Sequence, residues 1–203
     1  MSKTRLAVLV SGSGSNLQVL IDSIESGSIE AEIGLVISNE EEAFALQRAK
    51  KAQIDTKVFL PQDFESREIY DRELIETIKS HDIDLVVLAG YMLICSKQFV
   101  EELYGKLINL HPSLLPEFPG ADGIGDALKS GAKVTGVTVH FVDEGCDTGP
   151  IIFQEAVPIE EDDTKETLAK RIQSVEHQLL PKTVKYFAEG RLKLDGRKVT
   201  LAD

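Results

Sequence analysis

Short apolar runs alternate with amphipathic stretches through the first half of the chain. Residues 6–10 form an aliphatic run, a stretch rich in glycine and serine follows, and Leu17, Leu20, Ile21 and Ile24 then recur at helical spacing. The same alternation predicts strands at 33–37, 57–60 and 84–90 and helices at 41–52 and 66–80. Strands that alternate with helices form a parallel sheet covered on both faces. The pattern therefore predicts an α/β fold built on an open, mostly parallel, Rossmann-like sheet with helices on both faces.

The pattern changes from Lys106 onward. The elements predicted there are a strand at 106–110, a turn-rich stretch, a short helix at 126–131, strands at 134–143 and 150–159, and a long amphipathic helix at 164–189 with a bend at Pro181. The two alternating strands predict a mixed or antiparallel C-terminal extension of the sheet. No repeat or low-complexity linker interrupts the chain, so we expect residues 1–203 to form a single domain.

Charge and composition limit the classes of partner. The chain carries 34 acidic and 22 basic residues, a formal net charge of −12, which opposes a broad nucleic-acid interface but not a small anionic ligand held locally. The N-terminal apolar run is too short for a signal peptide, and the longest run, 85–95, is about half of a membrane-spanning helix. Cys95 and Cys146 lack the spacing of a disulfide framework or a zinc site. We expect a cytoplasmic protein with no metal, no nucleic acid and no membrane association.

A glycine-rich turn, SGSGSN at 11–16, follows the first strand and opens the first helix. Backbone N–H groups and the positive end of the helix dipole can hold a phosphate there. Leu17 stands where a dinucleotide-binding fingerprint needs its third glycine, and the Gly-Lys-Ser/Thr ending of a P-loop is missing. The turn therefore indicates a monophosphate site. The alternative is a tight turn with Ser15 or Asn16 capping the helix.

The four histidines differ in their surroundings along the chain. His81 follows a predicted helix and His177 lies within the last one, where a structural role is the ordinary interpretation. His140 alternates with hydrophobic residues, so it is either a buried, hydrogen-bonded strand histidine or part of a site. His111 ends a predicted parallel strand, which is where open α/β sheets place their ligand sites. His111 is therefore the histidine most typical of catalysis.

Two further polar residues complete a candidate site with His111. Asn109 lies two positions earlier on the same strand, so both side chains project to one side. Asp147 follows the predicted strand 134–143 in a loop, where it is either an Asx-turn former or a carboxylate that keeps His111 protonated. An amide N–H donor, an imidazole and a carboxylate together are suited to acyl transfer without a protein nucleophile.

The segments NLHPSLLPEFPG, GVTVHFVDEGCDTGPII and VLVSGSGSNLQ closely resemble the phosphoribosylglycinamide (GAR) formyltransferases of purine biosynthesis, in their short monofunctional form. The likeness runs from Leu6 to about Leu194. It implies the formyltransferase fold and transfer of a formyl group from 10-formyltetrahydrofolate, the co-substrate, to the amine of GAR on the route to IMP. It also implies a monomer or homodimer, with phosphate binding in residues 1–105 and catalytic and folate-binding elements in 106–203.

The resemblance carries over to individual residues. It implies catalytic roles for Asn109, His111 and Asp147, and contacts to GAR from Gly12, Ser13, Gly14, Ser15, Asn16 and Glu176. It implies folate contacts from Arg67, Tyr91, Met92, Leu93, Ile94, Cys95, Asn109, Val142, Cys146 and Asp147, with His140 and Ser113 in support. Leu93, Lys106 and Asp122 depart from residues common among these enzymes, so anion contacts at the first two and the role of the loop around Asp122 stay open.

Three other interpretations share parts of this pattern. Formyltetrahydrofolate hydrolases resemble the chain in the catalytic residues but have an N-terminal regulatory module, for which the first strand at residue 6 leaves no room. Methionyl-tRNA formyltransferases need a C-terminal RNA-binding domain and a surface that an acidic chain does not favour. A non-catalytic sensor of a phosphate-bearing ligand is the alternative from another class.

Overall fold

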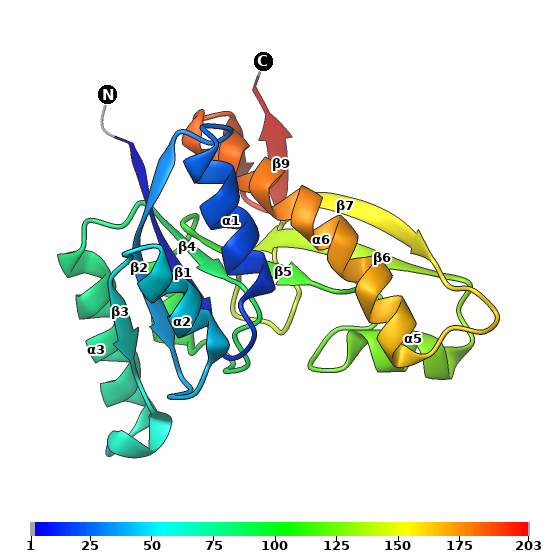
Figure 1. Ribbon diagram of the computed structural model, residues 1–203, viewed down its shortest axis with the longest axis horizontal. Helices are drawn as coiled ribbons and strands as arrows, with labels where there is room; N and C mark the ends of the chain where they lie inside the picture. The colour runs from blue at the N-terminus through cyan, green and yellow to red at the C-terminus, as the bar shows by residue number, and fades with distance from the viewer. Residues whose placement is uncertain (1–2, 203) are drawn as a thin grey trace. The chain divides into compact units, whose positions relative to one another are not determined.

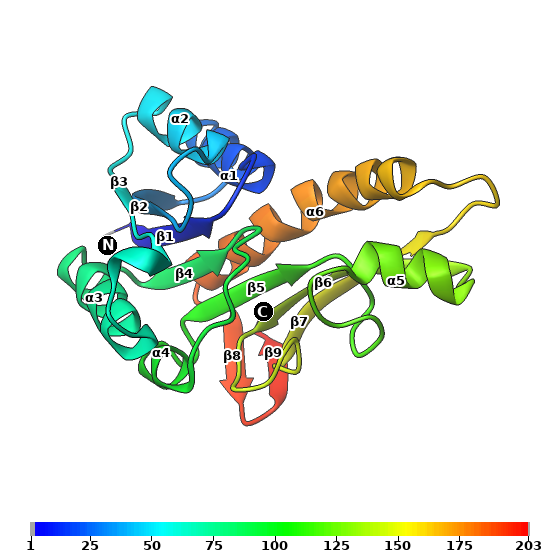
Figure 2. The ribbon, with the colours of Figure 1, turned by 90° about the horizontal axis from the view of Figure 1, so that it is seen from below.

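The computed structural model describes residues 3–202, and its contacts divide between Ile108 and Asn109 into two compact units (Figure 1). The first unit contains strands β1 (Thr4–Val10), β2 (Ala31–Ser38), β3 (Thr56–Val58) and β4 (Leu85–Leu88), helices α1 (Ser15–Glu25), α2 (Phe44–Lys51), α3 (Arg67–Ser80) and α4 (Lys97–Glu102), and a short 3-10 helix at Pro61–Asp63. Strand β1 pairs in parallel with β2 and β4, and β2 pairs in parallel with β3. Figure 2 shows α1 and α2 on one face of these strands and α3 and α4 on the other.

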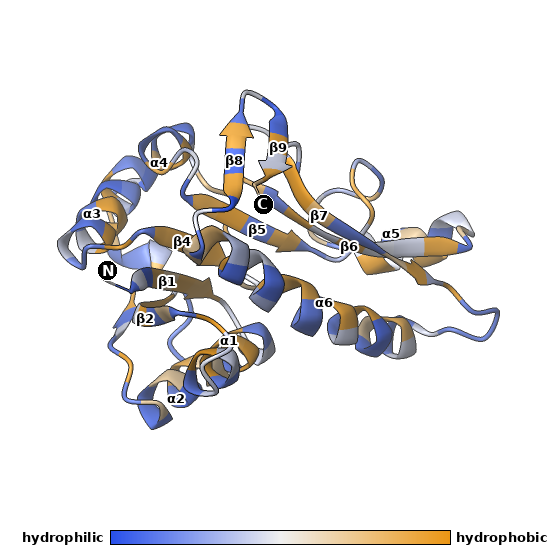
Figure 3. Cartoon of the chain, turned by 90° about the horizontal axis from the view of Figure 1, so that it is seen from above, coloured by the Kyte–Doolittle hydropathy of each residue, from blue (hydrophilic) through white to orange (hydrophobic). Residues whose placement is uncertain are grey.

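Burial explains why the strands of this unit are nearly continuous apolar runs. Every residue from Leu6 to Val10 in β1 is fully buried, and so, within a few per cent, is every residue of β4. A strand covered by helices on both faces has no polar side, so it lacks the alternation of a half-exposed strand. Figure 3 shows the contrast between the hydrophobic β1 and β4 and the mixed polarity of α1 and α2.

The second unit begins within β5 (Leu107–His111) and contains α5 (Gly123–Ser130), β6 (Val134–Phe141), β7 (Ile151–Pro158), α6 (Lys165–Ala188), β8 (Leu192–Asp195) and β9 (Lys198–Leu201). Strands β6 and β7 form an antiparallel hairpin, and α6 packs against both. Thr164 starts α6 with a capping box, in which its hydroxyl accepts from the N–H of Thr167 and the Thr167 hydroxyl accepts from the N–H of Thr164. The helix continues through Pro181.

The strands form a seven-stranded sheet in the order β3-β2-β1-β4-β5-β6-β7, and β8 and β9 form a separate two-stranded sheet. The predicted fold class, a mostly parallel α/β sheet with an antiparallel C-terminal extension, is confirmed. In residues 3–202, no helix is both long enough and apolar enough to cross a membrane.

Several element boundaries differ from the prediction. Helix α2 begins at Phe44 rather than 41. The Ser38 hydroxyl accepts from the N–H of Glu40 and donates to the Glu40 carbonyl, so residues 39–43 form a turn before the helix. Helix α5 begins at Gly123 rather than 126, because the Asp122 carboxylate caps it by accepting from the N–H of Gly125. The prediction omitted α4, the 3-10 helix and the β8–β9 hairpin.

Candidate functional site

His111 ends β5, and each nitrogen of its buried ring faces an oxygen. Nε2 lies 2.8 Å from the carbonyl oxygen of Phe118, and Nδ1 lies 3.3 Å from Oδ2 of Asp147. A carbonyl only accepts, so Nε2 carries a proton, and a neutral ring would then turn the lone pair of Nδ1 toward a carboxylate. The imidazolium donates to both oxygens instead. The geometry of His111 therefore favours the charged ring.

Asn109 projects to the same side of β5 and uses its amide nitrogen twice. Nδ2 donates to Oδ1 of Asp147 at 3.2 Å and lies 3.3 Å from Nε2 of His140. The His140 ring is buried, its Nδ1 donates to the Phe141 carbonyl at 2.8 Å, and its Nε2 lies 3.6 Å from Oδ1 of Asp147. The predicted juxtaposition of Asn109, His111 and Asp147 is present in the structure. His140 joins the cluster as a buried, hydrogen-bonded strand histidine.

Asp147 is the charged centre of this cluster. It has a left-handed backbone with φ 54°, and its Oδ2 also accepts from the N–H of Gly120 at 2.8 Å. Burial raises the pKa of Asp147, but the His140 ring, the Gly120 N–H and the charge of His111 outweigh it and lower this pKa to about 2. The Asx-turn role belongs to another residue, because Asp143 accepts from the N–H of Gly145 at 3.1 Å.

Hydrogen bonds join the segment after His111 to the β6–β7 hairpin. The buried Thr138 hydroxyl accepts from the N–H of Leu115 at 3.1 Å and donates to the carbonyl of Ser113 at 2.7 Å. Gln154 donates to the Leu115 carbonyl at 2.8 Å, and the buried Ser113 hydroxyl donates to the carbonyl of Glu117. These bonds fix the path of the chain toward Phe118, whose carbonyl oxygen contacts Nε2 of His111. Ser113 thus supports the cluster through the backbone of its own loop.

The glycine-rich turn of the first unit leads directly into α1. Gly14 caps α1 in the left-handed region with φ 68°, and a Cβ there would lie 2.5 Å from the Cβ of Ala45, so glycine is required. The alternative interpretation, a cap from Ser15 or Asn16, differs from the structure, in which the N-cap residue is Gly14. The N-cap residue of α1 is therefore a glycine, which has no side chain of its own with which to bond the first backbone N–H groups.

Arg48 of α2 brings a positive charge to this turn. Its Nε donates to the Ser13 carbonyl at 2.8 Å, its Nη1 donates to Oε1 of Gln18 at 3.1 Å, and its guanidinium lies over the Phe44 ring. The neighbouring Ala45 donates its N–H to the Gly12 carbonyl at 3.0 Å. Sequence reasoning missed Arg48, because nothing in the spacing of α2 connects it with a turn 35 positions earlier.

The segment 90–96 follows β4 and is held by several hydrogen bonds to the rest of the first unit. Met92 donates its N–H to the Ser11 hydroxyl at 2.8 Å, and the Tyr91 and Tyr70 hydroxyls are hydrogen-bonded at 2.6 Å. Arg67 donates to the Ile94 carbonyl at 2.7 Å and pairs with the buried Asp71. The guanidinium of Arg67 therefore holds the segment in place. Met92 and Ile94 are exposed, Leu93 is half-buried, and burial raises the pKa of the Cys95 thiol to about 12.

The remaining predicted site residues belong to the second unit. Val142 is buried directly after β6, Cys146 is exposed with its Sγ 3.7 Å from Oδ2 of Asp147, and Glu176 is half-buried on α6. His177 beside it is also half-buried, which lowers its pKa, and His81 ends α3 with Nδ1 2.8 Å from the Thr77 carbonyl. Across residues 3–202, no group of three or more histidine, cysteine, aspartate or glutamate side chains is arranged to hold a metal ion.

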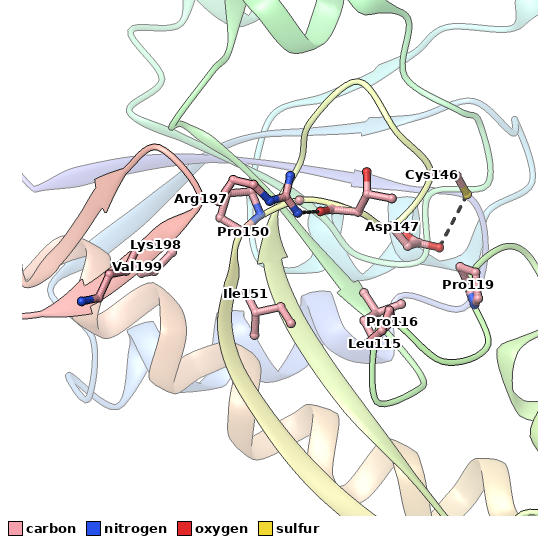
Figure 4. Close-up of a pocket in the computed structure, with 12 residues that line it drawn as sticks. Leu115, Pro116, Pro119, Cys146, Asp147, Pro150, Ile151, Arg197, Lys198 and Val199 are labelled. Carbon is pink, nitrogen blue, oxygen red and sulfur yellow. Dashed lines mark hydrogen bonds between the residues drawn. The ribbon is translucent and has the colours of Figure 1, made fainter.

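A cavity of about 530 Å³ adjoins Asp147 within the second unit (Figure 4). Its wall comes from the segment after His111, from the loop around Asp147 and from the β8–β9 hairpin. Leu115, Pro116 and Ile151 give it an apolar face, and Arg197 and Lys198 bring positive charge from the hairpin. The cavity thus places the C-terminal hairpin beside the loop that carries Asp147.

Residues 4–184 match the formyl transferase family, and so most of the chain is covered. The chain belongs to this family. It is 44% identical over 189 residues to the phosphoribosylglycinamide formyltransferase of Escherichia coli K12, a match that covers 93% of this chain and 89% of the relative. Its structure is similar to that of glycinamide ribonucleotide transformylase 1 from Symbiobacterium toebii, with a TM-score of 0.97, 43% identity and coverage of 100% and 95% of the two chains.

Longer members of the family match as well. The trifunctional purine biosynthetic protein adenosine-3 of Drosophila melanogaster is 48% identical over 190 residues. That match covers 93% of this chain but 14% of the relative's length. The formyl transferase family thus contains relatives of this chain both as separate proteins and as one part of a larger polypeptide.

Proposed function

We propose that this formyl transferase moves the formyl group of 10-formyltetrahydrofolate onto the amine of 5′-phosphoribosylglycinamide in the synthesis of purines. The observation that carries the proposal is the cluster of Asn109, His111 and Asp147, in a chain that resembles monofunctional GAR formyltransferases over nearly its whole length. The products are formyl-GAR and tetrahydrofolate. The enzyme acts by direct transfer, without a covalent intermediate on the protein.

The reaction needs charge stabilisation and one proton movement. The amine nitrogen of GAR attacks the formyl carbon, and the formyl oxygen becomes an oxyanion. The oxyanion then returns to a carbonyl as the bond from carbon to N10 breaks. The proton released by the new ammonium is passed to N10. Asn109 and the imidazolium of His111 donate to the oxyanion, and each such donor is worth about 3 to 4 kcal/mol in comparable sites. Asp147 keeps His111 charged and relays protons through water.

The present partners of the two donors indicate how they become available. His111 donates to the neutral Phe118 carbonyl, and Nδ2 of Asn109 lies 3.3 Å from Nε2 of His140. A bond from the imidazolium to an oxyanion gains a Coulomb attraction that its bond to a neutral carbonyl lacks. His111 therefore exchanges the Phe118 carbonyl for the oxyanion, and Asn109 donates its second N–H to the same oxygen while it keeps its bond to Asp147. The interaction is strongest in the transition state, which is the condition for catalysis.

The substrate contacts follow the same proposal. The phosphate of GAR binds the backbone of Gly12, Ser13, Gly14, Ser15 and Asn16, where Arg48 adds a positive charge, and Glu176 accepts from a ribose hydroxyl. Folate contacts are proposed for Tyr91, Met92, Leu93, Ile94 and Cys95 in the first unit and for Val142, Cys146 and Asp147 in the second. Arg67 supports the segment 91–95 through Ile94. The chain acts as one formyltransferase domain in the cytoplasm, as a monomer or homodimer.

The consumption of 10-formyltetrahydrofolate, measured with and without GAR, tests the proposal. Consumption that requires GAR and yields formyl-GAR supports it. Equal consumption without GAR indicates a hydrolase. Binding of GAR with no consumption of the folate indicates a phosphate-ligand sensor, and either of these two results contradicts the proposal.

A further inference from the structure

The loop 142–149, which carries Asp147, is closed at its base by hydrogen bonds. Oδ1 of Asp143 accepts from the Thr148 hydroxyl at 2.6 Å and from the N–H of Gly145 at 3.1 Å. A Cβ added at Gly149 would lie 1.7 Å from the Phe141 carbonyl oxygen, so the two ends of the loop touch and only glycine fits. Asp147 therefore projects from a loop whose two ends are held together at Asp143 and Thr148.

Arg197, from the β8–β9 hairpin, bonds to both Asp143 and Thr148. It lies in the turn between β8 and β9, with Nη1 donating to Oδ2 of Asp143 at 3.1 Å and Nη2 donating to the carbonyl of Thr148. The planar fork of a guanidinium suits two acceptors at once, and a lysine in its place provides only a point charge. Figure 4 shows Arg197 reaching from the hairpin toward the loop of Asp147.

The backbone of Asp147 depends on support from its surroundings. A non-glycine residue with φ 54° persists where neighbouring structure holds it. The carbonyl that Arg197 binds belongs to Thr148, the next residue along the chain. The contact therefore holds the peptide between Thr148 and Gly149, one residue beyond Asp147, and through Thr148 it limits the directions from which the Asp147 carboxylate can meet His111 and Asn109.

We propose that Arg197 is a positioning residue for Asp147, through which the C-terminal hairpin fixes the carboxylate against His111. The side chain of Arg197 is 72% exposed, and ion pairs of this kind contribute little to stability. The effect of Arg197 is therefore on the alignment of the cluster rather than on folding. Misalignment of a catalytic group by about 1 Å can lower turnover by roughly a hundredfold, so a small change in the loop is measurable.

The experiment compares Arg197→Ala and Arg197→Lys with Lys198→Ala, which removes an exposed positive charge from the adjacent position. NMR titration of the His111 ring is the first readout. Removing a positive charge by itself raises the midpoint of a nearby histidine, whereas a displaced Asp147 carboxylate lowers it. His140 and Cys146 also face Asp147 and are unchanged in all three variants. We expect the midpoint to fall in Arg197→Ala, to fall less in Arg197→Lys, and not to fall in Lys198→Ala.

Turnover is the second readout, and it rests on the proposed formyl transfer. We expect Arg197→Ala to lower kcat by about tenfold or more, with Michaelis constants and urea unfolding close to those of Lys198→Ala. Asp143→Asn combined with Arg197→Ala should be little worse than the poorer single variant, because the two side chains act as one unit. A His111 midpoint equal in Arg197→Ala and Lys198→Ala overturns the inference. That titration needs no substrate, so its result is separate from failure of the proposed function.

Discussion

The carboxylate of Asp147 meets the ring of His111 with 3.3 Å between Oδ2 and Nδ1, while Oδ1 of the same group accepts from Asn109. One half-buried carboxylate thus orients both residues proposed to act on the formyl oxygen. The two donors lie on β5, and Asp147 lies in the loop after β6. The activity of the cluster is therefore sensitive both to loss of either donor and to loss of the charge between them.

Loss of either donor should affect the rate far more than the fold. Asn109→Ala or His111→Ala should lower turnover by roughly a hundredfold or more, because each removes a hydrogen bond to the developing oxyanion. Steady-state rates with saturating GAR and 10-formyltetrahydrofolate measure the effect. His81→Ala is the control, since His81 only ends α3. Turnover in either variant equal to that of His81→Ala removes the residue from the mechanism.

Asp147→Asn keeps the size of the side chain and removes its charge. The amide no longer stabilises the imidazolium, so the midpoint of the His111 titration should move to lower pH and turnover should fall with it. Asp143 forms the turn bond of this loop, so the amide at 147 should leave the loop in place. NMR titration beside turnover for the same protein is the measurement. An unmoved midpoint with a normal rate assigns Asp147 to the scaffold alone.

The lowered pKa of Asp147 also predicts a dependence of stability on pH. A carboxyl with a pKa of about 2 when folded and ~3.9 when unfolded stabilises the folded chain by about 2 to 3 kcal/mol above ~pH 5. The contribution is lost as the pH falls from about 4 to 2, where the folded state also takes up the proton. Urea unfolding over this range should show a smaller acid loss for Asp147→Asn than for Asp195→Asn, an exposed control on β8. Equal losses contradict the prediction.

Arg48 should matter for GAR and not for the folate. Arg48→Gln removes the charge beside the glycine-rich turn and the bond to the Ser13 carbonyl, so the Michaelis constant for GAR should rise by about tenfold. The constant for 10-formyltetrahydrofolate and kcat should change little. Lys50→Gln, an exposed charge on the same helix, serves as the control. A larger change for the folate than for GAR contradicts the assignment of this turn to the phosphate.

The elements that could be predicted are those in which the pattern of apolar residues along the sequence follows the pattern of buried side chains. Strand β4 is apolar throughout because both faces are covered, and α3 is capped by Ser66, whose hydroxyl accepts from the N–H of Ile69. The omitted hairpin also left a signal, because Gly196 precedes Arg197 between the alternating runs LKLD and KVTL. Helix α4 is six residues long, and a helix of that length is too short for a periodic pattern to identify.

The site could be predicted only as far as local spacing reaches. Asn109 and His111 lie two apart on one strand, and this spacing alone places both on one side. The Phe118 carbonyl and the Gly120 N–H come from an aperiodic loop in which Phe118 has φ 55°, so no pattern of residue types identifies them. Arg197 meets Asp143 across 54 positions, and only the fold brings them together. Contacts made by backbone atoms and distant loops therefore needed the structure.

The bond from His111 to the Phe118 carbonyl has a consequence for selectivity. A water molecule or an unreacted formyl oxygen is neutral, like the carbonyl that already occupies the donor, and gains little by replacing it. A full negative charge on oxygen is what makes the replacement favourable. The amine of GAR generates that charge more readily than water, because it is the better nucleophile. On the proposed mechanism, His111 therefore gives little assistance to a formyl group that has not been attacked, and the preference for GAR over water rests on the nucleophilicity of the amine.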